Sequence, residues 1–336
     1  MAELSKSDAE QAMIARVFAP LTAGLPGALG LTDDAAILSA PSGRQLVLTM
    51  DTLVQGVHFL FDGSVQQASD AAYKALAVNV SDLVAKAADP LAYMLSLTLP
   101  AVGSTDWLEG LAEGFRQGQS DWSIHLAGGD TVRGTSGLAL TVTAIGSVPQ
   151  ETAVLRRNAR PGDRLIVTGT IGDAWAGLHV CQSSEAFAHL SRTDADFLKN
   201  RYQRPRPKLG IVEALRTYAS AAMDISDGLI LDLERMCRAS GVGACLRAPQ
   251  VPLSAPIQQL VNNQKVSLTD ALSGGDDYEI LAAVPPDALG AFAEAARHAG
   301  VSIAEVGEII ATLGVSVVGD DGNSLSITRK GWDHLG

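Results

Sequence analysis

Apolar and polar positions recur along this chain with the two periods that distinguish helices from strands. Residues 69–86 are rich in alanine and carry apolar side chains every three or four positions, which predicts a largely buried helix. Residues 45–54 are rich in β-branched and apolar residues, which predicts a strand. In the same half we expect a helix that begins at a capping box over 7–10 and runs to residue 18, a second over 105–117, and strands over 91–99, 123–127 and 138–148. This interleaving is typical of an α/β (α+β) fold, with a mixed sheet packed against helices in each half.

The second half repeats this pattern after a charged connection that contains proline and glycine, residues 156–163. Strands are expected over 164–168 and 222–225, and helices over 172–180, 207–219 and 229–238. We place the domain boundary near residue 150 and expect two domains, 1–150 and 151–336. The sequence Ala-Gly-Gly-Asp at 127–130 is echoed by Ser-Gly-Gly-Asp at 273–276, an offset of 274 − 128 = 146 residues. This short echo agrees with two similar halves.

Composition and charge exclude several classes of protein. The 336 residues are 47% hydrophobic and 18% charged, which is enough apolar material for a sizeable core and excludes a disordered chain. A formal net charge of −12 disfavours a protein that binds nucleic-acid backbones, so no nucleic-acid partner is expected. The sequence has no uninterrupted apolar stretch of membrane-spanning length and no secretory signal, and its 3 cysteines do not form a disulfide framework. We therefore expect a cytoplasmic protein without a membrane partner.

The placement of the aspartates is the strongest chemical signal. Five of them lie at predicted strand ends or beside glycine, and a sixth, Asp82, lies in the apolar helix. A buried carboxylate is costly unless a cation compensates it, and oxygen ligands of this kind suit Mg²⁺. Several Mg²⁺ ions would allow such a site to accept a polyphosphate, which glycine-flanked backbone N–H groups can approach closely. The five are Asp34, Asp51, Asp130, Asp224 and Asp227.

Simpler interpretations compete at each position. An aspartate beside glycine is more often a turn or a helix cap than a metal ligand, and Asp227 could cap the helix that follows it. His58 is as easily a structural histidine, and Trp332 a hydrophobic anchor. The sequence lacks the P-loop and dinucleotide glycine patterns, the zinc-binding H-E-x-x-H and the G-x-S-x-G nucleophile pattern.

Motifs along nearly the whole chain resemble those of the thiamine-monophosphate kinases, a family within the aminoimidazole ribonucleotide synthetase superfamily. The order and spacing of these segments carry the resemblance: LTDDAAIL (31–38), TMDTLVQGVHF (49–59), YKALAVNVSDLVAKAADP (73–90), LAGGDTVRG (126–134), RPGDRLIVTGTIGDAWAGL (160–178), MDISDGLILDL (223–233), LSGGDDYEI (272–280) and KGWDH (330–334).

The resemblance implies a two-domain synthetase-like fold, a homodimer formed through the N-terminal domains, and Mg²⁺-dependent transfer of the ATP γ-phosphoryl group to thiamine monophosphate. It implies that Mg²⁺ is bound by Asp34, Thr49, Met50, Asp51, Asp82, Asp130, Asp224 and Asp227. It implies ATP contacts from Gly129, Asp130, Arg156 and Ser226, and thiamine-substrate contacts from His58, Asp276 and Trp332.

The chain departs from the family pattern at four places. Met50 replaces Thr or Ser and could bind metal only through its backbone carbonyl. Thr32 stands where glycine is usual, and Asp276 is one methylene shorter than the family glutamate. Arg156 and Arg157 are adjacent, and alignment through Pro161 favours Arg156 as the phosphate contact.

The expected reaction is a direct in-line transfer with no covalent intermediate, because no His or Cys lies inside the aspartate motifs. Three alternatives remain open at this point. A synthetase of the same superfamily would use ATP to activate another group, a metal-dependent phosphatase would need no ATP, and a cation-binding assembly protein would form no product.

Overall fold

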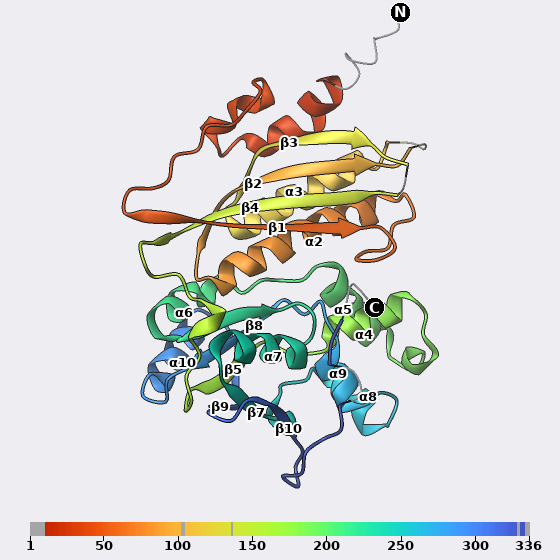
Figure 1. Cartoon of the computed structure of the whole chain (residues 1–336). Coiled ribbons are helices and arrows are strands. Elements are labelled where there is room, and N and C mark those ends of the chain that lie inside the picture. The colour runs from red at the N-terminus through yellow and green to blue at the C-terminus, as the bar shows by residue number, and fades with distance from the viewer. Residues whose placement is uncertain (1–10, 102–104, 136, 328–329, 333–336) are drawn as a thin grey trace, which may run out of the picture. The chain divides into compact units, whose positions relative to one another are not determined.

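A computed structural model of the chain describes residues 11–101, 105–135, 137–327 and 330–332 (Figure 1). Contacts divide the chain into two units, one formed by Met1–Leu83 and Asp89–Glu151, the other by Val84–Ala88 and Thr152–Gly336. Each unit has a sheet of its own. Within the described residues, no helix is long and apolar enough to cross a membrane.

The first unit is built on a four-stranded mixed sheet in the order β1-β4-β2-β3. Strand β4 pairs antiparallel with both β1 and β2, whereas β2 and β3 are parallel. Strand β1 alternates between a covered and an open face, so that Thr49, Asp51 and Leu53 face the covered side. The strands are β1 (Arg44–Val54), β2 (Asp89–Leu99), β3 (His125–Arg133) and β4 (Ala139–Pro149).

Helices α2 (Val65–Ala85) and α3 (Leu108–Trp122) lie along one face of this sheet (Figure 1). They pack closely because α3 carries glycine where it meets α2: a Cβ at Gly114 would lie 2.0 Å from the Ser69 carbonyl oxygen. The chain before β1 forms three short helical turns, of which the second and third contact β3. These turns are η1 (Ile14–Phe18), η2 (Ala19–Thr22) and η3 (Pro26–Leu31).

The second unit has a six-stranded mixed sheet in the order β10-β7-β9-β5-β8-β6. Its largest apolar cluster packs α7 against buried positions of these strands, among them Val167, Met223 and Leu281. The strands are β5 (Arg164–Thr168), β6 (Ala221–Ile225), β7 (Gly243–Arg247), β8 (Glu279–Val284), β9 (Ile303–Ile310) and β10 (Gly314–Val318). The α-helices are α4 (Asp173–Cys181), α5 (Arg192–Gln203), α6 (Val212–Tyr218), α7 (Leu229–Ser240), α8 (Ala255–Asn262), α9 (Leu268–Ser273) and α10 (Leu289–His298). The shorter turns are η4 (Arg156–Asn158), η5 (Glu185–Phe187), η6 (Leu209–Ile211) and η7 (Ala248–Gln250).

The predicted class, two halves that each pack a mixed sheet with helices, is confirmed. The strand predicted over 164–168 matches β5, and that over 45–54 matches β1 to within a residue. The capping box over 7–10 lies outside the described residues, and Ile14–Phe18 forms a π-helical turn where we expected an α-helix.

The strand expected to end at residue 127 instead continues as β3 through the Gly-Gly-Asp segment to Arg133, because this segment pairs with β2. Its echo at 273–276 has a different structure: the segment begins at the last residue of α9 and then runs as a loop. The echo therefore does not mark equivalent structural positions.

Candidate functional site

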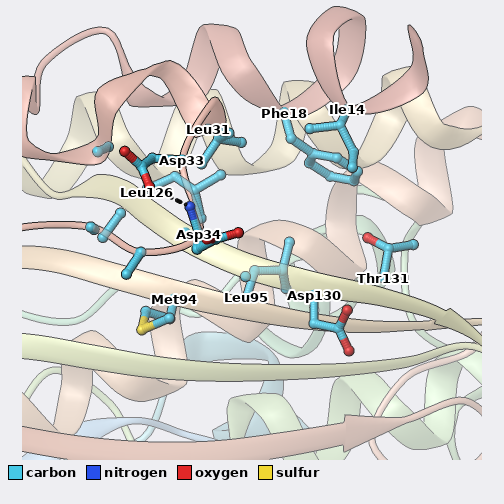
Figure 2. A pocket seen from close by; sticks show the side chains of 16 residues that line it. Ile14, Phe18, Leu31, Asp33, Asp34, Met94, Leu95, Leu126, Asp130 and Thr131 are labelled. Atoms are coloured by element: carbon cyan, nitrogen blue, oxygen red, sulfur yellow. Dashed lines mark hydrogen bonds between the residues drawn. The ribbon is translucent and has the colours of Figure 1, made fainter. Parts of the chain in front are cut away.

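In the first unit, a pocket of about 200 Å³ lies between the N-terminal turns and strands β2 and β3 (Figure 2). One part of its wall is apolar, formed by side chains that include Ile14, Phe18 and Leu31. The pocket is also lined by three carboxylate residues and the glycines of β3. These are Asp33, Asp34, Asp130, Gly128 and Gly129. The pocket thus combines an apolar wall with carboxylate groups and with the backbone of two glycines, which carry no side chain of their own.

A turn of unusual backbone delivers the aspartate pair to this pocket. Leu29, Gly30 and Leu31 all have left-handed backbone, with φ of 53°, 63° and 60°. Thr32 has an ordinary φ of −103°, so the glycine usual at this position is not required here. The Thr32 hydroxyl donates to the Leu29 carbonyl at 2.7 Å and closes the turn.

Asp33 is a pocket residue to which the sequence analysis assigned no role. Its Oδ1 accepts a hydrogen bond from the backbone N–H of Asp34 at 2.7 Å (Figure 2). The signal in the sequence was the doubled aspartate, of which only the second member matched a family ligand. This hydrogen bond helps to fix the backbone of Asp34 at the pocket.

Gly129 and Asp130 lie inside strand β3. Asp130 pairs with Ser96 of β2, and Gly129 with Leu95. A Cβ at Gly129 would lie 1.9 Å from the Leu95 carbonyl oxygen, so packing alone requires glycine there. Asp130 is exposed and lines the pocket, as a ligand-binding role requires.

A second cluster of polar residues links strand β1 to helix α2. The Thr49 hydroxyl donates a hydrogen bond to Oδ2 of Asp82, and the Asp51 backbone N–H donates to Oδ1 of Asn79 at 3.1 Å. Asn79 is fully buried, and its amide also donates to the Ala75 carbonyl at 2.9 Å. The predicted ligands Thr49, Asp51 and Asp82 therefore lie together.

The pairing register leaves the Met50 carbonyl on the free edge of β1. In an antiparallel pair, alternate residues direct their N–H and C=O groups toward the partner strand. The Gln55 N–H donates to the Leu138 carbonyl and the Gln150 N–H to the Gly43 carbonyl, so in this unbroken register the odd-numbered residues of β1 face β4. Met50, opposite Thr143, therefore faces away from β4, as a carbonyl ligand would have to.

These two groups of acids do not meet within the first unit. Strands β1 and β3 form opposite edges of the sheet and are separated by two strands. At the usual strand spacing, their backbones are roughly 14 Å apart. The predicted Mg²⁺ ligands of this unit therefore form a pocket group (Asp34, Asp130) and a β1–α2 group (Thr49, Asp51, Asp82).

His58 is held by its own loop. Its Nδ1 accepts a hydrogen bond from the Val54 N–H at 3.1 Å, and its carbonyl accepts one from Lys74 Nζ at 3.0 Å. Lys74 is only 1% exposed. The structural interpretation of His58 thus has direct support, and a substrate contact would have to use Nε2.

In the second unit, the turn after β6 brings four predicted residues together. The Asp276 N–H donates to the Ser226 carbonyl at 2.8 Å, and the Trp332 N–H donates to the Asp227 carbonyl at 2.9 Å. Trp332 is 43% exposed, more than a buried anchor would be. Ser226, Asp227, Asp276 and Trp332 therefore form one cluster.

Asp227 does not cap helix α7. The N-cap is Gly228, which has no side chain to donate or accept. Asp232, in the first turn of the helix, instead holds the turn before it, because its Oδ2 accepts the N–H groups of both Ser226 and Asp227 at 3.0 Å. Asp227 itself pairs with Arg235, which also bonds Asp232. Burial raises the pKa of Asp232 to about 6, despite these hydrogen bonds.

Asp224 lies two residues before Ser226, and Arg156 lies elsewhere in this unit. Asp224 is a buried residue of β6 that pairs with Ile280 of β8. The Arg156 carbonyl accepts a hydrogen bond from Ser240, the last residue of α7, whereas Ser226 precedes the first. Since α7 has 12 residues and is about 18 Å long, the backbone of Arg156 is not beside Ser226. Arg156 and Arg157 are both exposed, so their burial does not distinguish them.

The donor atoms suit Mg²⁺, although they do not form a complete cage. Among the described residues, no three His, Cys, Asp or Glu side chains lie close enough to hold a metal ion by themselves. Mg²⁺ is commonly bound through one or two carboxylates, with water and substrate phosphate as the remaining ligands. The pocket group and the β1–α2 group each supply carboxylate oxygens, which fits this mode of binding.

Comparison with known proteins defines the class to which this fold and site belong. Family models match both halves of the chain: AIR synthase related protein, N-terminal domain, over residues 32–148, and AIR synthase related protein, C-terminal domain, over residues 160–320. The chain is therefore a member of the AIR synthase related proteins.

Closer relatives narrow the class. A thiamine-monophosphate kinase of Caulobacter vibrioides is 41% identical over 325 residues, which cover 96% of this chain and 89% of that protein. The crystal structure of thiamine-monophosphate kinase from Stenotrophomonas maltophilia K279a has a TM-score of 0.78 and 37% identity, and covers 88% of this chain and 91% of that one. A structure of AaThiL complexed with AMPPCP and TMP has a TM-score of 0.75 and 27% identity, and the match covers 99% of this chain and 98% of that one. The chain belongs to the thiamine-monophosphate kinase family.

Proposed function

We propose that this chain transfers the γ-phosphoryl group of ATP to thiamine monophosphate in a Mg²⁺-dependent reaction, giving thiamine diphosphate and ADP. The pocket of the first unit carries the proposal, because Asp34 and Asp130 stand there beside the backbone of Gly129. Kinase relatives over nearly the whole chain support it, as does the relative complexed with AMPPCP and TMP.

We propose that Mg²⁺ is held in the first unit by Asp34 and Asp130 at the pocket and by Thr49, Asp51 and Asp82 at the β1–α2 group. Asp224 and Asp227 remain proposed ligands in the second unit. When bound, Mg²⁺ would neutralise phosphate charge and orient the phosphoryl group. Met50 is proposed to join the β1–α2 group through its backbone carbonyl, which the pairing register directs to the free edge of β1.

The residues of the chain bind and orient, and none needs to act as a covalent carrier. The second pKa of a phosphate monoester is about 6, so the acceptor is largely ionised near neutral pH and needs little help from a base. Gly129 brings backbone close to the pocket, and Asp33 fixes the neighbouring Asp34. In-line transfer then depends on position and charge neutralisation.

We further propose that Asp130, Gly129, Ser226 and Arg156 contact ATP and that His58, Asp276 and Trp332 contact the thiamine substrate. The clustering of Ser226, Asp276 and Trp332 around one turn supports these roles. The exposed indole of Trp332 could stack on a cationic ring of thiamine.

We also propose a homodimer formed through the open face of the first sheet. This face exposes apolar residues on three strands, including Leu48 at 62% and Met50 at 64% exposed. Met94 of β2 is 44% exposed on the same face, because Met50 and Met94 both pair with Thr143 of β4. A large apolar patch of this kind marks a surface that another protein surface covers.

A cytoplasmic location is likewise proposed. Cys181, Cys237 and Cys245 form no disulfide with one another, as in proteins of reducing compartments.

One assay tests the activity. Purified protein is incubated with ATP, Mg²⁺ and thiamine monophosphate, and the products are separated by chromatography. Equimolar thiamine diphosphate and ADP are expected. Phosphate released without ATP would instead indicate a phosphatase, and ATP consumption without thiamine diphosphate a synthetase-like activity. The absence of any product would overturn the proposal.

A further inference from the structure

Five charged side chains gather in the second unit, behind the loop that carries Asp276. Three are carboxylates that are almost completely buried: Asp173, Asp277 and Glu279 are 0%, 1% and 1% exposed. Two are cations, Arg201 of α5 and Lys208. The proposed function assigns none of these residues a role.

Arg201 connects these carboxylates from helix α5. Its Nη2 donates to Glu279 Oε1 at 2.9 Å, and its Nε lies 3.5 Å from Asp173 Oδ2. The Arg201 side chain is only 13% exposed. Lys208 Nζ lies 3.2 Å from the same Glu279 oxygen, and the Thr168 hydroxyl donates to the other at 2.6 Å. Glu279, at the start of β8, is therefore fixed from three sides.

Asp277 ties the loop to helix α4. Its two carboxylate oxygens accept the N–H groups of Gly172 at 2.7 Å and Ala174 at 3.2 Å. Burial, together with the nearby charge of Asp173, raises the pKa of Asp277.

The backbone of this loop needs such anchors. Asp276 has φ of 72° and Tyr278 φ of 51°, so both residues that flank Asp277 adopt left-handed backbone without being glycine. Such conformations are strained and persist only where the surrounding structure holds them. The Tyr278 hydroxyl donates to Asp276 Oδ1 at 3.1 Å, so the strained segment also sets the direction of the Asp276 carboxylate.

Helix α5 meets this loop at a second residue. Burial, and after it the nearby charge of Asp276, raises the pKa of Tyr202. Consecutive residues of α5 thus interact with this segment, Arg201 with Glu279 and Tyr202 with Asp276.

We propose that Arg201 is a positioning residue for the phosphate acceptor: by holding Glu279 and Asp173, it keeps the strained loop in the conformation that aims Asp276 at the substrate. This rests on the proposed substrate contact of Asp276. The acceptor is a phosphate monoester with a cationic heteroaromatic body, to which a correctly aimed carboxylate is complementary.

The test compares Arg201→Gln and Arg201→Lys with wild type in the full-length protein. The matched control is Arg192→Gln, since Arg192 lies on the same helix with its side chain 96% exposed. The Michaelis constants for thiamine monophosphate and ATP and kcat are measured separately, and binding of thiamine monophosphate alone is measured by calorimetry.

Arg201→Gln should raise the KM and Kd for thiamine monophosphate by about tenfold or more, because a small misplacement of a substrate contact is costly. The KM for ATP should rise by clearly less, since the loop supplies no residue to the proposed ATP set and meets it at the Ser226 backbone carbonyl. Arg201→Lys keeps the positive charge but loses the planar guanidinium. Its KM for thiamine monophosphate should lie between those of wild type and Arg201→Gln. Arg192→Gln should match wild type.

A purely structural role would give a different result. Lower kcat in proportion to the folded fraction, with an unchanged KM for thiamine monophosphate, would overturn the proposal. If Arg201→Gln does not fold, Arg201→Lys and Glu279→Gln decide the question by the same split between the two Michaelis constants. Wild-type protein that makes no thiamine diphosphate would refute the proposed function instead, so the two failures are distinguishable.

Discussion

The hydroxyl of Thr49 donates a hydrogen bond to the carboxylate of Asp82, which links strand β1 to helix α2. Replacement of Thr49 by valine keeps the shape of the side chain and removes the donor. We expect Thr49→Val to raise the Mg²⁺ concentration needed for half-maximal activity by about tenfold, as loss of a partner to a metal ligand commonly does.

The control for Thr49→Val is Thr52→Val on the same strand. Thr52 lies on the open face of the sheet, where its hydroxyl is 2.9 Å from that of Thr141. Titration of activity with Mg²⁺ should leave this control unchanged. Equal Mg²⁺ dependence in both variants would mean that the Thr49–Asp82 contact has no part in metal binding.

Asp130 should be required for activity at limiting Mg²⁺. Asp130→Asn preserves the size of the side chain but removes the charge that the pocket offers to a cation. We expect kcat/KM for ATP to fall by about 100-fold at limiting Mg²⁺, in the range for loss of one preorganised electrostatic contact. Asp196→Asn, whose side chain is 61% exposed on α5, is the control. Full activity of Asp130→Asn under these conditions would remove Asp130 from the site.

Gly129 should tolerate no side chain, whereas its neighbour should. A Cβ at Gly129 would meet the Leu95 carbonyl oxygen at 1.9 Å, but at Gly128 the nearest atom is the Met94 Cε at 3.7 Å. Gly129→Ala should therefore destabilise the first unit by about 2 kcal/mol or more, and Gly128→Ala by clearly less. Thermal unfolding of the two variants measures the difference, and equal melting temperatures would contradict the packing argument.

Asp232 should make stability depend on pH in an unusual direction. Its pKa rises from 3.8 to about 6 on folding, mainly through burial, so ionisation is harder in the folded state. Below pH 3.8 the carboxyl is protonated in both states, and the folded state has its full stability. As the pH rises from 3.8 to about 6, the unfolded chain ionises first, so the free energy of unfolding falls. The loss amounts to about 3 kcal/mol for a shift of this size.

Asp232→Asn removes that titration. The difference in unfolding free energy between the variant and wild type, measured by urea denaturation in EDTA, should move in favour of the variant between pH 4 and pH 6. A constant difference across this range would show that Asp232 does not titrate there.

The open sheet face predicts a dimer that one charge can break. Leu48 is 62% exposed in the single chain. We expect Leu48→Asp to give a monomer by light scattering coupled to gel filtration, because a buried unpaired carboxylate at an interface is costly. Leu313→Asp is the control, since Leu313 is 74% exposed and belongs to the second unit. A wild-type monomer at micromolar concentration would refute the dimer.

Hydrophobic periodicity predicted the fold better than the details of the site. Strands such as β1 and β5 were predictable because their apolar runs are long and bounded by turn residues. Asp51 was expected near a strand end but lies within β1, because alternation fixes the face of a residue and not its distance from the end. The pairing that keeps Gly128 to Asp130 inside β3 depends on β2, which no local pattern reveals.

Local sequence also left open whether Asp227 caps helix α7. Asp227 stands where a capping residue is usual, yet the N-cap is Gly228, and Asp232, five residues after Asp227, accepts the N–H groups of the turn before the helix. The contact between Arg201 and Glu279 joins residues 78 positions apart, so spacing could not have indicated it. Such contacts follow from the order of strands and helices in space.

Arg235 gives the turn after β6 its own counter-ion. The guanidinium bonds both Asp227 and Asp232, so two acids of this turn are balanced in the protein alone. Any cation that binds Asp227 must therefore compete with a tethered positive charge. Binding of a cation at Asp227 would displace a charge that is already present, so it would gain less free energy than binding at an unpaired carboxylate.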